Sequence, residues 1–163
     1  MNIEYRELFK NIESRTDIGI GLEMLTEKIL ETTVCELIND KRIINHLLEY
    51  RSTYYISLNK KLKELNLSEI LDYLREFVLL EYMIPLISRY IELYPLMPGA
   101  FFHGEYLFII FQIDKSFWNA HKNWYFFFIG IVEDVLNNYK KEELNEKILD
   151  VLTQVINNNQ LSQ

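Results

Sequence analysis

Apolar residues recur at helical spacing along most of the chain. Ile3, Leu8, Phe9 and Ile12 share one face of a first segment, with charged residues on the other face. The same period of about 3.6 residues returns in later segments, with breaks between them. We therefore expect helices over residues 3–12, 17–38, 40–65, 69–94, 116–139 and 142–157.

Prolines, glycines and polar residues mark where these helices begin, bend and end. Asp40 caps a long predicted helix, which runs to Leu65 before Asn66 breaks its pattern. Pro85 lies within the next apolar run, so the segment 69–94 is either kinked or divided into two helices. The sequence of residues 94–99, Tyr-Pro-Leu-Met-Pro-Gly, predicts a loop.

The segment after this loop is rich in aromatic residues. Residues 101–139 hold 13 of the 23 aromatic residues of the chain. As a helix starting at Ser116, this region presents two apolar stripes, which indicates burial on most sides. As strands, residues 105–113 and 124–132 could pair in a hairpin, because aromatic and branched residues favour sheets. The helical interpretation is favoured, since the same period continues into residues 133–139.

The composition agrees with a helical fold. The chain has 163 residues, of which 5 are Gly and 3 are Pro, which is few for the many turns of a sandwich or barrel. We predict an all-α, single-domain bundle of six to seven helices over residues 1–163, with residues 157–163 frayed. The alternative is an α+β fold with one aromatic hairpin at about residues 105–132.

Charge indicates the type of partner. Seventeen Lys and Arg against 24 Asp and Glu give a net charge of −7, which opposes binding to nucleic-acid phosphates or anionic lipid. Acidic residues gather between residues 13 and 40, where Glu23, Glu27 and Glu31 recur every four positions on one helix face and Asp40 follows. This face is either simply solvated or a docking surface for a basic protein.

Compartment and membrane association follow from cysteine usage and hydropathy. The single cysteine, Cys35, cannot form an internal disulfide, and no basic-then-apolar signal opens the chain. The strongly apolar stretches at residues 106–111 and 124–132 are shorter than the roughly 18 to 20 residues that span a bilayer. We therefore expect a cytoplasmic protein with no membrane partner.

Motifs for catalysis or metal binding are absent from the sequence. No phosphate loop, dinucleotide fingerprint, nucleophile elbow or zinc-protease motif occurs, and three histidines with one cysteine supply few metal ligands. We therefore expect no catalytic residue, metal or cofactor. The alternative is an enzyme or small-ligand binder with an aromatic pocket, formed by Phe101, His103, Glu105, His121 and Trp124.

A small acidic chain with an aromatic surplus and no catalytic set resembles the immunity proteins of bacterial toxin systems, including those of contact-dependent growth inhibition. The resemblance lies in size, charge and general character over the whole chain. It implies a protein that neutralises a cognate cationic toxin domain, often a nuclease, by occlusion, with acidic groups pairing with its Lys and Arg. A regulatory helical subunit is a further alternative, and a homodimer is possible. The expected partner-binding residues are Glu23, Glu27, Glu31, Asp40, Tyr94, Phe101, Phe102 and Tyr106.

Overall fold

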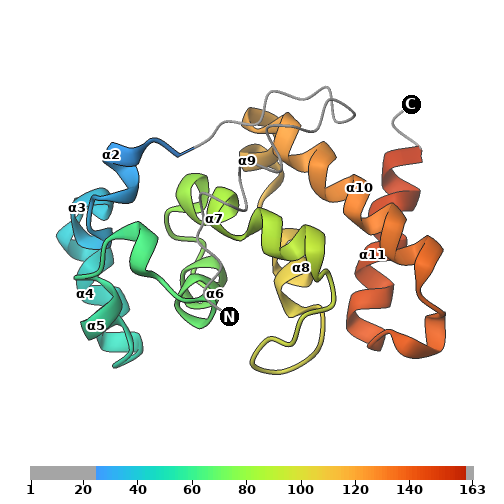
Figure 1. The fold of residues 1–163 in the computed structure, drawn as a ribbon, viewed down its shortest axis with the longest axis horizontal. Coiled ribbons are helices and arrows are strands. Elements are labelled where there is room, and N and C mark those ends of the chain that lie inside the picture. Colours follow the sequence, from blue (N-terminus) through green and yellow to red (C-terminus); the bar gives the residue numbers. More distant parts are fainter. Residues whose placement is uncertain (1–24, 161–163) are drawn as a thin grey trace. The chain divides into compact units, whose positions relative to one another are not determined.

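The computed structural model describes residues 25–160, and every regular element in that range is a helix (Figure 1). The predicted all-α class is confirmed, and residues 105–132 form helices, so the alternative hairpin is wrong. Contacts divide the described residues into two compact units, 25–87 and 88–160. The expected single domain stays a prediction.

The first unit consists of short helices followed by the start of a long one. Its elements are α2 (Glu27–Leu30), α3 (Val34–Ile38), α4 (Lys41–Tyr50), α5 (Tyr54–Ser57), the 3-10 helix η1 (Leu62–Glu64), α6 (Leu67–Arg75) and the first part of α7 (Leu80–Leu93).

Capping side chains explain where several of these helices begin. Thr33 forms a capping box with Glu36 at the start of α3. Asp40 accepts a hydrogen bond from the backbone N–H of Arg42 at the start of α4, as its predicted capping role requires. Asn66 forms a second capping box, with Glu69, at the start of α6. These side chains accept bonds from backbone donors that the first helical turn leaves unpaired.

The predicted long helix over residues 40–65 is wrong, because α4 ends at Tyr50 and Arg51 adopts an extended backbone. The Nη1 of Arg51 bonds to Asp72 of α6 at 2.9 Å, and the hydroxyl of Tyr54 bonds to the carbonyl oxygen of Asp72 at 2.9 Å. These contacts with α6 override the local helical period. The described part of the predicted helix over residues 17–38 is likewise interrupted, at Thr33 between α2 and α3. The predicted helix over residues 3–12 lies outside the described residues.

Residues 31–35 and 58–62 hold the first unit together through backbone bonds. The N–H of Val34 donates to the carbonyl of Lys60 at 3.0 Å, and that of Leu62 donates to Thr32 at 3.1 Å. An isolated antiparallel bridge joins Thr33 and Lys61 between these two bonds. The irregular segment after α5 is therefore fixed against the start of α3.

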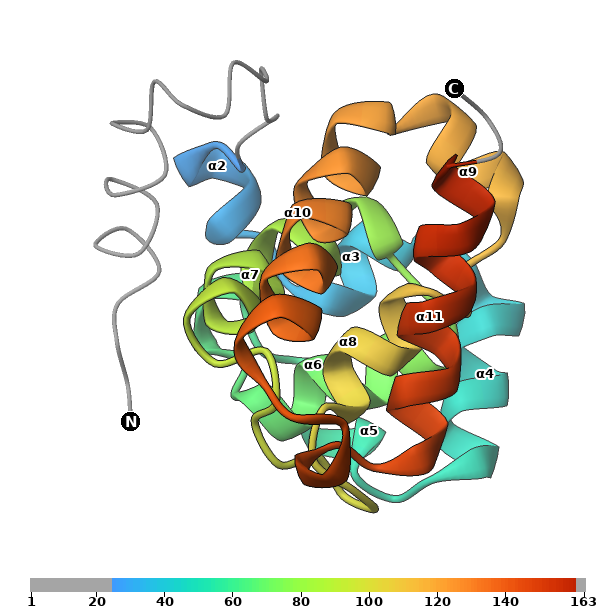
Figure 2. The ribbon, with the colours of Figure 1, turned by 90° about the vertical axis from the view of Figure 1, so that its right-hand side faces the viewer.

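The second unit contains the aromatic region. Its elements are the end of α7, then α8 (Glu105–Ile110), α9 (Lys115–Ala120), α10 (Lys122–Asn138), the 3-10 helix η2 (Lys141–Glu143) and α11 (Glu146–Gln160). Helix α11 packs against both α8 and α10 (Figure 2).

Burial in the second unit follows the aromatic stripes of α10. Trp124, Phe127, Phe128 and Val132 are buried, and Trp124 stacks on Phe128 with ring centroids 6.3 Å apart. Phe126 points to the remaining side, with 51% of its surface exposed, so burial is less complete than the two stripes suggest.

Three further boundaries differ from the predicted ones. The helix expected from Ser116 breaks at His121, between α9 and α10. The segment 69–94 does divide into two helices, but the break lies at residues 76–79, and Pro85 sits inside α7. Helix α11 continues through Gln160, into the tail that was expected to fray.

Candidate functional site

Acids of the predicted docking surface form ion pairs with bases of the same unit. Lys61 donates to Glu31 at 2.6 Å, and Lys63 forms a second ion pair with the same carboxylate. Hydrogen bonds from Lys61 and then Lys63 lower the pKa of Glu31 to about 2. The charge of Glu31 is therefore met by two bases of the same unit.

The other predicted acids are not gathered beside Glu31 into one free surface. Asp40 caps α4 and pairs with the guanidinium of Arg42 at 3.0 Å, and this pairing lowers the pKa of Asp40. Glu27 is exposed on α2, and Glu23 lies outside the described residues. Spacing in the sequence identified the acids, but it could not show that Lys61 and Lys63, thirty residues later, would pair with Glu31.

The loop between α7 and α8, residues 94–104, is the strongest candidate site (Figure 1). We call it the aromatic loop, because it contains Tyr94, Phe101 and Phe102. Its backbone closes on itself: the N–H of Gly99 donates to the carbonyl of Phe102 at 3.1 Å, and that of Gly104 donates to Met97 at 3.0 Å. An isolated bridge between Pro98 and His103 lies within the same closure.

A buried carboxylate holds the aromatic loop through a hydrogen bond to the loop backbone. Glu105, the first residue of α8, is 3% exposed, and its Oε2 accepts a hydrogen bond from the N–H of Phe101 at 3.0 Å. Gly99 lies directly against this side chain, where an added Cβ would meet the Cδ of Glu105 at 2.9 Å. The absence of a side chain at Gly99 therefore lets Glu105 reach the loop backbone.

The end of the aromatic loop requires a second glycine. Gly104 has φ 84°, a left-handed conformation that costs most residues roughly 1 to 2 kcal/mol. A Cβ at Gly104 would also lie 3.2 Å from Leu96 and 3.3 Å from Ile148 of α11. The turn into α8 is thus fixed by conformation and by close packing against α11.

The four aromatic residues predicted to bind a partner lie at different depths. Phe101 is 77% exposed, a larger fraction than that of any other large apolar residue in the described range, and Tyr94 is 45% exposed. Phe102 is half-buried, with its ring edge-on to Phe108 and the ammonium of Lys147 at 5.8 Å. Tyr106 is 4% exposed, so its expected surface role is wrong: it belongs to the inward side of α8.

The residues predicted to form the alternative aromatic pocket make contacts of different kinds. The carboxylate of Glu105 holds the backbone of Phe101, while His103 is exposed on the loop. His121 stacks on Phe117 at 4.3 Å, and Trp124 packs within the aromatic cluster of α10. Within residues 25–160, no group of three or more His, Cys, Asp or Glu side chains could hold a metal ion.

Sequence reasoning missed two features of the surface. Phe77, after α6, is 49% exposed and has φ 53°, a conformation that no periodicity could reveal. Helix α4 exposes both Ile43 and Tyr50. The spacing in the sequence already places Ile43, His46 and Tyr50 on one face of α4, next to buried Leu47.

Comparison with models of protein families, with curated proteins and with solved structures finds no match for this chain. Among the helices of the described range, none combines the length and the apolar character needed to cross a bilayer.

Proposed function

We propose that this chain is a binding protein of immunity type, which captures a cationic protein through the aromatic loop and occludes it. The observation that carries the proposal is the exposed ring of Phe101 on a loop whose backbone is already fixed. Rigid aromatic side chains supply large contact area at low entropic cost, and they are frequent anchors of protein interfaces. Prior closure of the loop lowers the ordering cost of binding.

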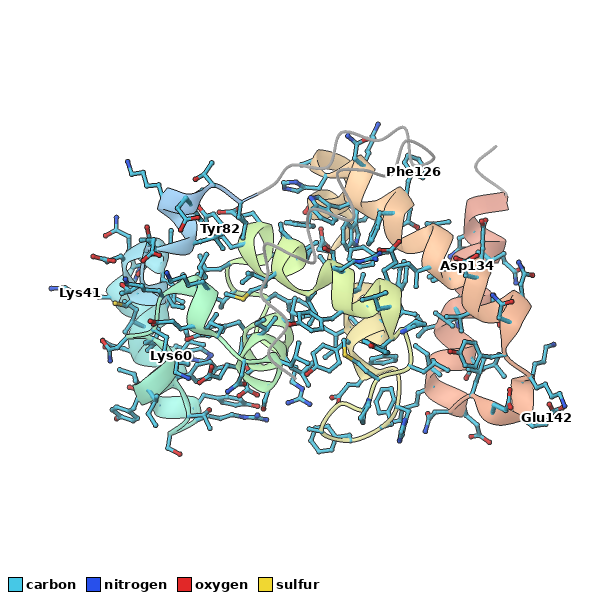
Figure 3. All side chains as sticks on the ribbon, in the orientation of Figure 1. Lys41, Lys60, Tyr82, Phe126, Asp134 and Glu142 are labelled. Carbon is cyan, nitrogen blue, oxygen red and sulfur yellow. The ribbon has the colours of Figure 1, made fainter. Side chains whose placement is uncertain are left out.

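The surroundings of the aromatic loop suit a protein partner. Helix α11 reaches the loop through Lys147 and Ile148, and the preceding residues Glu142, Glu143 and Glu146 are exposed. Figure 3 labels Glu142 at this end of the second unit. Lys140 and Lys141 lie among these acids, so the local charge is mixed.

Electrostatic attraction to the partner comes from the chain as a whole, whose net charge is −7. Attraction of this kind raises association rates with a basic protein and is weakened by salt. Apolar packing around Phe101 would then supply slow dissociation. In this division of roles, direct pairing of Glu23, Glu27, Glu31 and Asp40 with Lys and Arg of the partner is no longer required.

The resemblance to immunity proteins suggests which partner the chain binds. The partner is then a toxin domain with a basic active site, and the bound chain sterically blocks access to that active site. No bond is made or broken on this chain. Its protective effect is therefore stoichiometric, with one binding surface occupied for each toxin domain neutralised.

The test is growth rescue together with complex formation. The product of the gene upstream of the one encoding this chain is expressed in a bacterial host with and without the full chain, and the two purified proteins are mixed and sized. We expect rescue and a stable complex. Absence of both would overturn the proposal.

Matched variants locate the interface. Phe101→Ser should slow growth rescue and raise the dissociation constant at least tenfold, because it removes the proposed anchor. Phe126→Ser, which removes an exposed ring from α10 in the same unit, should leave both unchanged. Equal loss in the two variants would place the contact outside the aromatic loop.

A further inference from the structure

The exposed face of α4 carries a pattern that is complementary to itself. Ile43, His46 and Tyr50 lie at positions i, i+3 and i+7 and therefore share one side of the helix. Ile43 is 39% exposed, Tyr50 is 58% exposed, and the side chain of His46 is 66% exposed. Leu47, four residues after Ile43 and three before Tyr50, borders this side of the helix and is buried. An apolar stripe thus remains uncovered along α4 within the described part of the chain.

Charges flank this stripe with opposite sign at its two ends. Lys41 and Arg42 begin α4, and the side chain of Arg42 is 92% exposed although it pairs with Asp40. In Figure 3 the side chain of Lys41 extends away from the helix. Exposed Glu49 lies in the last turn. Asp40 offsets one of the two bases at the start, and Arg51, whose guanidinium lies 5.7 Å from the ring centroid of Tyr50, follows Glu49 at the end. Arg42 and Glu49, seven residues apart, still lie on one side of the helix at opposite ends of the stripe.

From this arrangement we infer that α4 pairs antiparallel with α4 of a second copy of the chain, about a twofold axis near His46. In that register Ile43 of each copy meets Tyr50 of the other, and Arg42 of each copy meets Glu49 of the other. A twofold interface requires one surface to be complementary to itself, and this pattern satisfies that condition for both the apolar and the charged positions. The inference is independent of the proposed capture of a cationic protein.

A second copy suits this face better than a strongly basic partner. Lys41 and Arg42 would repel a cationic protein from the first turn of α4, whereas a second α4 presents Glu49 to them. The carboxylate of Glu76, after α6, lies 4.0 Å from the imidazole of His46, and the next residue, Phe77, is 49% exposed. A helix of ten residues is about 15 Å long, so the interface is small and the dimer reversible.

The first test measures the oligomeric state of the full chain by sedimentation equilibrium over a range of concentrations. We expect the apparent mass to rise from 19.7 kDa toward twice that value as concentration increases. A mass that stays at 19.7 kDa up to the solubility limit would overturn the inference.

The second test uses charge reversal at the predicted pairs. Glu49→Arg and Arg42→Glu should each raise the dimer dissociation constant by roughly tenfold, because each places like charges opposite one another at two symmetric points. The double variant should restore the original value. Failure of this rescue, with both single variants folded by circular dichroism, would place any dimer on another surface.

The charge-reversal test must separate loss of pairing from misfolding and from a change in net charge. Glu49→Arg puts a base in the last turn of α4, where it suits the negative end of the helix, so this variant is expected to fold. Glu133→Arg makes the same charge change on exposed α10 and serves as the control. An equal effect of Glu133→Arg would assign the weakening to net charge and would contradict pairing through α4.

Discussion

At the residue scale, a buried pair of hydroxyl groups holds α5 against α6. The Oγ of Ser57 and the phenolic oxygen of Tyr73 lie 2.8 Å apart, and both residues are almost fully buried. Burial raises the pKa of Tyr73 to about 12, so the phenol stays neutral throughout the physiological range. The ring of Tyr73 also packs on Tyr54, with centroids 5.1 Å apart. The hydrogen bond thus lies inside an aromatic contact that excludes water.

Removing both hydroxyl groups should cost less stability than the two single removals added together. Tyr73→Phe or Ser57→Ala leaves one buried hydroxyl without its partner, and each should lower the free energy of unfolding by about 1 to 2 kcal/mol. The double variant should lose less than the sum of the two, since no unpaired group remains. Urea unfolding of the four proteins measures this coupling. Strict additivity would show that the hydrogen bond contributes nothing specific.

At the element scale, α6 ends in a motif that usually contains glycine. The N–H of Val78 donates to the carbonyl of Tyr73, and the N–H of Phe77 donates to that of Leu74, both at 3.1 Å. These two bonds form a Schellman motif, in which the residue at the position of Phe77 takes a left-handed conformation. Phe77 has φ 53° and is 49% exposed. A strained aromatic residue thus occupies the end of α6.

Phe77→Gly should therefore stabilise the folded chain. Glycine adopts the left-handed conformation without strain, which should raise the free energy of unfolding by up to about 1 kcal/mol. Loss of the half-buried ring removes some apolar burial and offsets part of this gain. Thermal unfolding measures the change, and Phe77→Ala is the matched control, because it loses the ring but keeps a Cβ. A glycine variant less stable than the alanine variant would show that φ at this position is not a source of strain.

The element boundaries show which features the sequence could predict. Asp40 and Asn66 are caps that act through neighbouring residues, and the sequence predicted a helix start or break at both. The end of α4 depends on contacts of Arg51 and Tyr54 with Asp72, some twenty residues away, and no local pattern contains that information. Local chemistry therefore predicted the helical class and several starts, whereas the division of residues 40–65 required tertiary contacts.

The same distinction applies to the candidate site at the scale of the whole molecule. Two prolines and a glycine predicted the loop, and the aromatic count predicted that rings would lie near it. The structure adds that Glu105 turns inward to bind the loop backbone and that Tyr106 is buried beside it. The acidic face could not be assessed from the sequence, because its charge depends on pairing between Glu31 and distant lysines.

Several carboxylates of the folded chain have a lowered pKa, and together they predict how stability responds to acid. Hydrogen bonds from Lys61 and Lys63 lower the pKa of Glu31 from 4.5 to about 2, and local hydrogen bonds lower those of Glu36, Asp40 and Asp114. A group with a lower pKa in the folded state stabilises it fully above the unfolded value and progressively less as pH falls. For Glu31 that loss falls between pH 4.5 and about 2.

Glu31→Gln should flatten this part of the acid response. The variant cannot carry the charge that Lys61 and Lys63 bind, so its stability should be lower than that of the original chain near neutral pH, and the difference should shrink below pH 4.5. Urea unfolding at a series of pH values measures both curves, and Glu133→Gln, which removes one negative charge from exposed α10, is the control. A difference between the Glu31→Gln variant and the original chain that stays constant from neutral pH down to pH 2 would mean that the two lysines do not depend on this carboxylate. Added salt should reduce the same difference at neutral pH, because the pair is exposed to solvent and therefore screened.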